Sequence, residues 1–204
     1  MGERGLVLSL FDLTGNMVRP WAEAGYETVC IDIQRDGTDI LRWIPPRREY
    51  RIVFAFPPCT NLAVSGARWF RDKGLSGLAS AIELVERARD ICEWSGAPWM
   101  LENPVSTLSS YWRKPDHIFH PWQFAGLEPR DLYTKKTCLW TGGGFVMPEP
   151  RPLHGAGAPD DRIHKAPPGD ERANFRSATP MGFARAVFLA NERIGALEPS
   201  HDRR

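Results

Sequence analysis

The first half of the chain alternates short hydrophobic runs with amphipathic stretches. Hydrophobic runs of this length, bounded by turn residues, are typical of buried strands. They cover residues 5–11, 26–33, 51–56 and 99–101. Between them, residues 17–24 and 78–92 repeat hydrophobic positions at helical spacing. Strands that alternate with helices predict an α/β fold with a doubly wound, mostly parallel sheet.

The second half has a different pattern. Residues 142–173 are rich in Gly, Pro and charge and have little hydrophobic periodicity, which predicts a long irregular loop. A final helix is predicted from Pro180 to Ile194, followed by a mobile tail over residues 198–204. At 204 residues, the chain is expected to form a single domain, residues 1–204, around one core.

Composition adds little to this picture. Hydrophobic residues make up 42% and charged residues 25%, and the formal net charge is +1. The net charge therefore provides no strong overall electrostatic attraction for nucleic acid, but it does not exclude a local basic surface. No signal-peptide pattern or membrane-spanning run is present, so a cytoplasmic protein without a membrane partner is expected.

The cysteines and histidines do not suggest a metal site. The four cysteines are scattered and form no CxxC pair, which suits a reducing compartment and argues against a structural zinc site. His117 and His120 lie beside prolines without a carboxylate motif, so a loop role is favoured over metal ligation.

Two positions at predicted strand ends suggest a nucleotide-binding layout. Gly15 lies in the turn after the first strand, and Asp32 ends the second strand. In open α/β sheets the amides of such a turn face a ligand, and the acid holds ribose hydroxyls. A generic turn followed by a surface acid explains the same pattern, and both interpretations stay open.

Cys59 follows the third predicted strand, which stops at Pro57-Pro58. Two prolines cannot continue a central strand, so the backbone leaves the sheet stiffened, with Cys59 at the ligand-binding edge. A thiol held there is a candidate nucleophile, although an ordinary buried thiol fits as well.

Glu102 favours the nucleophile interpretation. It follows the predicted strand 99–101, so it is expected beyond that strand's end, facing the same crevice as Cys59. A carboxyl group that has lost water tends to keep its proton. A thiol beside such a group suits addition to an electron-poor ring. A capping or salt-bridging acid is the alternative.

These segments, in this order, resemble the cytosine-5 DNA methyltransferase family, and more closely its short phage and prophage members. The matching segments span nearly the whole chain. Residues 10–16 match the cofactor loop, 30–33 the acid that holds the ribose, and 37–40 the segment near the adenine. Residues 56–59 match the Pro-Cys motif and 101–104 the Glu-Asn motif. Residues 133–140 match a basic motif, and 176–184 match the closing segment.

The resemblance implies a Rossmann-like fold of the S-adenosylmethionine-dependent methyltransferase type and a site assembled from these motifs. Catalytic roles fall to Cys59, Glu102 and Lys135. S-adenosyl-L-methionine is expected to contact Phe11, Asp12, Thr14, Gly15, Asn16, Asp32, Ile33, Asp39 and Pro57. Substrate contacts are expected from Pro58, Asn61, Arg68, Trp69, Asn103 and Lys136.

The chain departs from the family pattern at several positions. Leu13 and Asn16 stand where glycine is usual, and Lys135 stands where arginine is common. Residues 142–173 replace a target-recognition domain and are too short and polar to build a core of their own. Little sequence preference is therefore expected if the protein acts alone on DNA.

The sequence thus predicts a methyltransferase acting on carbon 5 of cytosine, in DNA or in a free nucleotide, in a bacterial or phage-infected cell. A non-catalytic nucleic-acid-binding relative stays open. An amino-group methyltransferase is disfavoured because Phe56 stands where that class has Asn or Asp. Arg68-Trp69 suits stacking on a base, or else a solvated helix edge.

Overall fold

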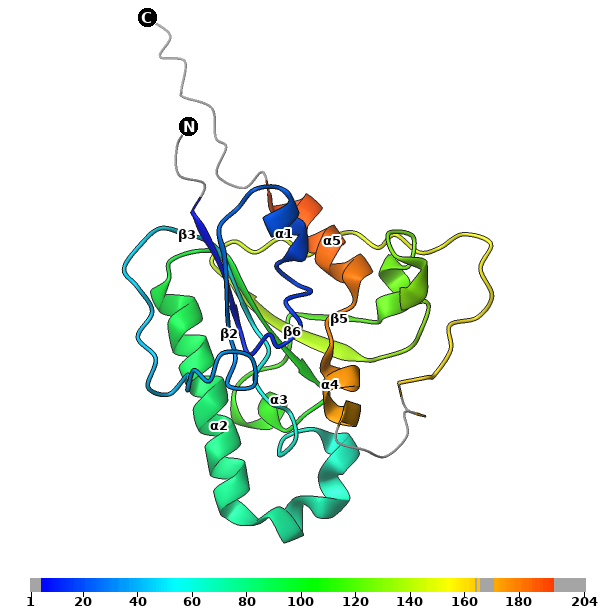
Figure 1. Ribbon diagram of the computed structural model, residues 1–204. Coiled ribbons are helices and arrows are strands. Elements are labelled where there is room, and N and C mark those ends of the chain that lie inside the picture. Colours follow the sequence, from blue (N-terminus) through cyan, green and yellow to red (C-terminus); the bar gives the residue numbers. More distant parts are fainter. Residues whose placement is uncertain (1–4, 164, 166–170, 193–204) are drawn as a thin grey trace, which may run out of the picture.

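The computed structural model describes residues 5–163, 165 and 171–192. Six strands form one mixed, mostly parallel sheet in the order β2-β1-β3-β4-β6-β5 (Figure 1). The strands are β1 Leu6–Leu10, β2 Thr28–Ile31, β3 Tyr50–Ala55, β4 Trp99–Pro104, β5 His117–Phe119 and β6 Thr137–Gly142. The first four are parallel, as their hydrophobic runs predicted, whereas β6 is antiparallel to both β4 and β5.

Helices cover both faces of the sheet. The α-helices are α1 Arg19–Glu23, α2 Phe70–Trp94, α3 Leu108–Tyr111, α4 Glu171–Ser177 and α5 Met181–Asn191, with 3-10 turns η1 Val64–Trp69, η2 Pro121–Phe124 and η3 Pro129–Asp131. On one face α2 packs Val85, Ala88 and Ile91 against alternate residues of β1 and β3. On the opposite face α1 and α5 pack together over the sheet.

The residues of β1 show why helices are needed on both faces of the sheet. Leu6, Leu8 and Leu10 contribute to the cluster under α2, whereas Val7 faces the cluster under α1 and α5. Because successive side chains of a strand point to opposite faces, a strand buried on both sides must be hydrophobic at nearly every position. The predicted α/β class with helices on both faces is therefore confirmed.

The end of β4 differs from the prediction. The strand was expected to stop at Leu101, but it continues to Pro104, so Glu102 and Asn103 lie inside it. The reason is the unpredicted strand β6, which pairs Glu102 with Leu139 and Asn103 with Cys138. Glu102 is therefore fixed by a ladder of backbone hydrogen bonds on the sheet.

The segment after β6 is irregular but attached to the domain. Residues 143–163 contain turns and one isolated bridge, Tyr133 to Asp160. Backbone hydrogen bonds from Arg151 to Gln123, from Asp160 to Leu132 and from Thr134 to Asp160 hold it against the η2–η3 region. The predicted irregular loop is thus confirmed for this stretch, except that Gly142 belongs to β6 and the last residues, 171–173, belong to α4.

Three other boundaries moved. The first helix is shorter than residues 17–24, because residues 16–18 form a turn and α1 begins at Arg19, followed by Pro20. The long helix α2 begins earlier than predicted, and Gly74 interrupts it with φ 68° and ψ 178°. The last helix ends at Asn191, and its predicted continuation to Ile194 lies outside the described residues, as does the tail 198–204. In the part of the chain that is described, no helix is long and hydrophobic enough to cross a membrane.

Candidate active site at the carboxyl ends of the strands

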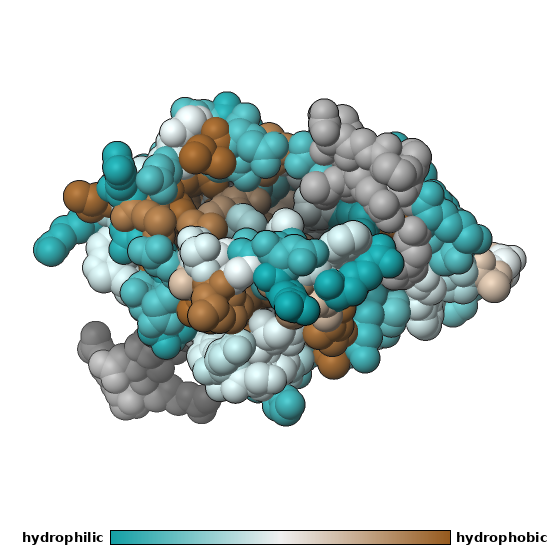
Figure 2. All heavy atoms as spheres, turned by 90° about the horizontal axis from the view of Figure 1, so that it is seen from below, coloured by the Kyte–Doolittle hydropathy of each residue, from teal (hydrophilic) through white to brown (hydrophobic). Residues whose placement is uncertain are grey.

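The strand order places a crevice between β1 and β3. From β1 the chain crosses to β2 by way of α1 on one face, and from β3 it crosses to β4 by way of α2 on the other face. Strand connections that leave in opposite directions open a crevice at the carboxyl ends, where open α/β sheets bind ligands. Figure 2 looks onto this edge of the sheet, where hydrophobic patches lie between hydrophilic ones around a recessed centre.

The loop after β1 is folded by Asp12. This buried carboxylate accepts hydrogen bonds from Ser9 Oγ at 2.9 Å, Thr14 Oγ1 at 3.2 Å and Gly15 N at 2.8 Å. Phe11 precedes it with a positive φ of 58°, which is uncommon for a residue other than glycine and is typical of strained functional loops. Asp12 therefore shapes the predicted cofactor loop from within.

The end of β2 lies beside this loop. Phe11 N donates to Ile31 O at 2.7 Å, and the next residue, Asp32, is 8% exposed with Oδ1 accepting from Gln34 N. Ile33 is 65% exposed, so a hydrophobic surface flanks the acid. The structure thus brings together the loop after β1, Asp32 and Ile33, three of the predicted cofactor elements.

Asp39 forms a local turn. Its carboxylate accepts from Leu41 N at 3.0 Å and lies 3.6 Å from Arg42 Nε. The following residue, Ile40, is buried in the cluster under α2, and its carbonyl accepts from Arg87. Asp39 therefore organises a turn that is attached to α2.

The Pro-Pro-Cys loop is held rigidly between neighbouring elements. Asn103 Nδ2 donates to Pro57 O at 3.0 Å from inside β4, and Cys59 O accepts from the amides of Leu62 and Ala63. Asn61 Nδ2 donates to Gly77 O at 3.0 Å. The loop continues along the chain after β4, where Thr107 N donates to Leu62 O and Val64 N to Val105 O.

Two predicted substrate contacts therefore have structural partners. Asn103 is fully buried and Asn61 half-buried, and each places its amide group on a backbone carbonyl. These contacts position Cys59 from both sides. Pro57 is buried beneath the loop, whereas Pro58 is exposed.

Glu102 and Lys135 form a partly desolvated ion pair near Cys59. Lys135 Nζ lies 3.7 Å from Glu102 Oε1, and the two side chains are 13% and 14% exposed. The buried Oε1 has no hydrogen-bond partner among the described residues. Burial raises the pKa of Glu102, and the charge of Lys135 opposes that shift. An unsatisfied carboxyl oxygen of this kind is unfavourable unless a ligand or water completes it.

Cys59 is in the electrostatic field of the same groups. Burial raises the pKa of its thiol and the charge of Glu102 adds to this shift, while Lys135 and Arg176 lower it. The Cys59 thiol therefore holds its proton, and forming the thiolate depends on nearby positive charge or on a proton acceptor. The predicted association of Cys59, Glu102 and Lys135 is present in the structure.

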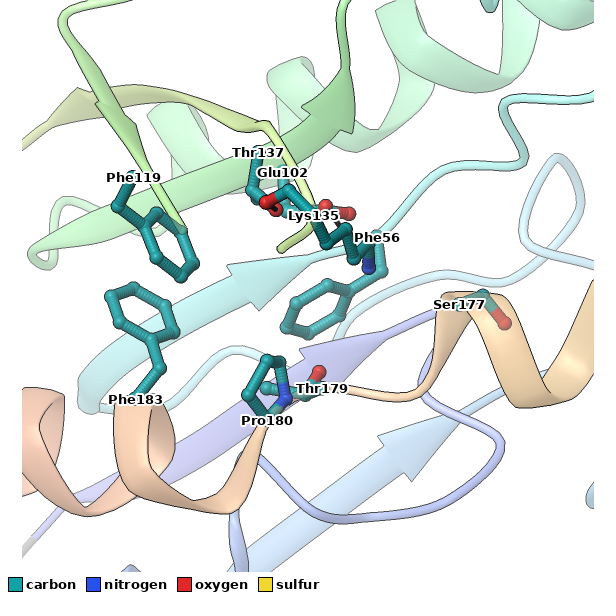
Figure 3. A pocket seen from close by; sticks show the side chains of 9 residues that line it. All are labelled: Phe56, Glu102, Phe119, Lys135, Thr137, Ser177, Thr179, Pro180 and Phe183. Carbon is teal, nitrogen blue, oxygen red and sulfur yellow. Dashed lines mark hydrogen bonds and ion pairs between the residues drawn. The ribbon is translucent and has the colours of Figure 1, made fainter. Parts of the chain in front are cut away.

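A small hollow opens beside Glu102 (Figure 3). Its lining is part aromatic and part polar: Phe56, Glu102, Phe119, Lys135, Thr137, Ser177, Thr179, Pro180 and Phe183. Phe119 and Phe183 stack with ring centroids 4.0 Å apart on one side, and Phe56 points toward Thr179 and Pro180. The hollow has a volume of about 10 Å³, room for about one water molecule.

Several predicted substrate residues lie apart from the hollow. Trp69 is 51% exposed in η1, with the Arg68 guanidinium carbon 5.1 Å from its ring centroid. Lys136 is exposed next to the inward-facing Lys135. The structure leaves these side chains on the surface around the site rather than in its lining.

Several residues of the crevice had no contact assigned to them from the sequence, among them two aromatic residues and one arginine. Phe56 and Phe119 line the hollow, and Arg35 donates to Leu13 O at 3.3 Å. Phe56 could have been found from its place at the end of β3, whereas Phe119 lies on a strand with no clear sequence signal. Arg35 lies 3.1 Å from the point where a Cβ of Gly15 would stand, so glycine leaves room for the guanidinium.

Among the described residues, no three His, Cys, Asp or Glu side chains gather as a metal site. No family model and no curated protein matches this chain.

Proposed function

We propose that the protein is an S-adenosylmethionine-dependent methyltransferase that acts on carbon 5 of cytosine. One observation carries the proposal: Cys59 lies on a rigid loop beside the buried Glu102, whose Oε1 accepts no hydrogen bond from the described residues and is paired with Lys135 at 3.7 Å. The mixed sheet with helices on both faces is compatible with the Rossmann-like fold of such enzymes, and the site lies at its carboxyl edge.

The residues around the first crevice fit the cofactor. S-adenosylmethionine supplies the methyl group. Asp32 lies at the end of β2, where ribose hydroxyls bind in this fold class, and its Oδ2 has no hydrogen-bond partner among the described residues. Exposed Ile33 offers a surface for the adenine. Asp12 keeps the loop over Thr14 and Gly15 in shape.

The residues around Cys59 fit the acceptor. In the proposed mechanism, Cys59 loses its thiol proton to solvent and Sγ forms a bond to C6 of cytosine as the C5–C6 double bond opens, while Glu102, protonated, donates a hydrogen bond to N3. Carbon 5 then acquires the methyl group and loses its proton to solvent, and the Sγ–C6 bond breaks. Lys135 stabilises the thiolate and limits the pKa of Glu102.

The substrate is DNA or a free cytosine nucleotide. On a duplex, the target base must leave the helical stack to reach Cys59. The hollow beside Glu102 is smaller than a pyrimidine ring, so Thr179 and Pro180 must also move away from Phe56. Exposed Arg68, Trp69 and Lys136 supply charge and a stacking surface around the entrance.

A second candidate is a non-catalytic nucleic-acid-binding relative of the same fold. Arg35 favours it, because its guanidinium lies across the space between the loop after β1 and the end of β2. Arg35 is exposed, so it can swing aside or pair with the cofactor carboxylate. Isothermal titration with S-adenosylmethionine separates the two candidates, since only the methyltransferase binds it.

The decisive experiment incubates the protein with methyl-labelled S-adenosylmethionine and separate samples of duplex DNA, single-stranded DNA, RNA and cytosine nucleotides. We expect labelled 5-methylcytosine in at least one sample, and none with Cys59→Ala, because no other group forms the bond to C6. The Cys59→Ala protein should still fold and bind the cofactor.

Cys92→Ala is the matched control, because Cys92 is a fully buried thiol of α2. It should keep methyl transfer. Full activity of Cys59→Ala would disprove the mechanism, whereas a protein that neither binds the cofactor nor labels any sample would favour the non-catalytic candidate.

A further inference from the structure

Residues 174–180 comprise the end of α4 and its connection to α5, and they pass between the two halves of the site; we call them the closing strap. The framework fixes the strap at its far end. Gly182 N donates to the buried Asp131 Oδ2 at 2.6 Å. A Cβ on Gly182 would lie 2.4 Å from Phe124 O, so α5 begins in close contact with the backbone of η2.

Toward the cofactor crevice, the strap is held by side chains. Asn16 Nδ2 donates to Thr179 O at 3.0 Å, and Asn174 Nδ2 lies 3.5 Å from Gln34 Oε1. Asn16 belongs to the loop after β1, and Gln34 follows Asp32 at the end of β2. The first contact is the shorter and less exposed of the two.

On its other side the strap forms a wall of the hollow. Ser177, Thr179 and Pro180 line it opposite Glu102 (Figure 3). Thr179 thus contacts both halves of the site: its carbonyl oxygen accepts the hydrogen bond from Asn16, and the residue lines the hollow. Arg176, also on the strap, acts on the charge state of Cys59.

We propose that Asn16 is a positioning residue that links occupancy of the cofactor crevice to the shape of the hollow through Thr179. The link rests on the proposed function, because it requires the crevice to hold S-adenosylmethionine and the hollow to admit a pyrimidine. A ligand that orders the loop after β1 also fixes the Asn16 amide, and the strap is then held against the hollow.

Asn16 stands where the resembled family usually has glycine, and glycine has no side chain to make this contact. Its second contact allows a clean variant. Asn16 Oδ1 accepts from Arg19 Nη2 at 3.3 Å, on the exposed side of the loop. Asn16→Asp keeps an oxygen for Arg19 and removes the donor to Thr179, whereas Arg19→Gln weakens the Arg19 contact and leaves the Thr179 contact intact.

The test is amide hydrogen exchange of the full chain with and without saturating S-adenosylmethionine. We expect the cofactor to slow exchange in residues 11–18 and in residues 176–184 of the unmodified protein. In Asn16→Asp the first region should stay protected, while protection of the second falls by about fivefold, the effect of one hydrogen bond on such an equilibrium. Arg19→Gln should behave like the unmodified protein.

The outcomes separate this inference from the proposed function. Equal protection of residues 176–184 in Asn16→Asp and in the unmodified protein overturns the link and leaves the cofactor assignment standing. Loss of cofactor binding in Asn16→Asp also overturns it, because Asn16 would then contact the cofactor directly. If S-adenosylmethionine protects neither region of the unmodified protein, both the link and the cofactor assignment are wrong.

Discussion

Lys135 illustrates how one charge acts on two titrating groups of the site. Its Nζ lies 3.7 Å from Glu102 Oε1, and it lowers the pKa of both Glu102 and Cys59 against the effect of burial. Arginine is common at this place in the resembled family. A lysine supplies the charge without a planar fork, so here its effect is that of a compact positive charge.

We therefore expect Lys135→Met to slow alkylation of Cys59. Without the lysine charge the pKa of the Cys59 thiol rises further, so less thiolate is present at any pH below that pKa. The measurement is the rate of iodoacetamide labelling of the Cys59 peptide across a pH series, read by mass spectrometry. The rate profile of the variant should shift to higher pH.

Lys136→Met is the matched control, because Lys136 is the exposed neighbour with the same charge. It should leave the profile of Cys59 nearly unchanged. A similar shift in both variants would mean that Cys59 responds to general surface charge, and the local role of Lys135 would be wrong.

Asp32 carries the prediction about the cofactor. We expect Asp32→Ala to weaken S-adenosylmethionine binding by about 1–3 kcal/mol, the scale of charge-assisted hydrogen bonds lost from a site. Isothermal titration measures the change. Asp36→Ala tests the specificity of the effect, because Asp36 is an exposed acid of the same segment that caps Thr38 N. Unchanged affinity in Asp32→Ala would make Asp32 a surface acid only.

Among the elements, β4 was predicted from the sequence, whereas β6 and its pairing with β4 were not. The alternation of the runs of β1, β3 and β4 with helices predicted parallel strands, and their hydrophobic residues at nearly every position fit cover on both faces. The strand β6 is equally buried over residues 137–140, but two lysines precede it and two glycines follow it. Its pairing with β4 extends that strand to Pro104, and no local pattern around Glu102 signalled this.

The candidate site was predicted by topology more than by local pattern. Parallel strands end at one edge, so Cys59 and Glu102 were expected together there, and the structure places Lys135 with them. The partners of Asn103 and Asn61 were not predictable, because each binds the carbonyl of a residue far away in the sequence. The turn that Asp39 forms was not predicted either, because it depends on Ile40 packing under α2.

Asn103 gives a prediction about how β4 holds the nucleophile loop. We expect Asn103→Ala to lower the free energy of unfolding by about 1–3 kcal/mol, because it leaves the Pro57 carbonyl without a donor in a buried place. Urea denaturation measures the change. Asn61→Ala removes a half-buried contact to Gly77 O and should have a smaller effect.

The same variant bears on catalysis. With its link to β4 removed, Cys59 is less well positioned, so methyl transfer should fall by more than cofactor affinity. Equal stability of Asn103→Ala and the unmodified protein would show that the buried amide does not hold the loop.

At the scale of the whole molecule, the packing helices and the site residues lie on different parts of the sheet. The helices α1, α2 and α5 pack on its faces, and the loops that follow β1, β2 and β3 meet at one edge (Figure 1). Base-edge contacts supply about 1–3 kcal/mol per position, so sequence preference depends on how many side chains the surface around this edge presents.

The described surface offers few such side chains. Three short loops carry basic or aromatic side chains suited to base contacts, around Arg68, Trp112 and Lys135. Lys135 forms an ion pair with Glu102. Trp112 is half-buried and stacks on Trp140, with ring centroids 5.8 Å apart. Residues 143–163 lie against the η2–η3 region through backbone hydrogen bonds. The exposed pair Arg68–Trp69 suits phosphate and base faces, which carry little sequence information.

We therefore expect the protein acting alone to discriminate little between sequences that flank the target cytosine, and its DNA binding to fall steeply with salt because phosphate contacts dominate. Methylation of random-sequence DNA, followed by sequencing of the modified cytosines, measures this preference. Enrichment of a motif of about four or more base pairs would contradict it, since each would need its own base-edge contact. Modification of a free cytosine nucleotide, with no modification of any polymer, would keep the roles of Cys59 and Glu102 and change the substrate alone.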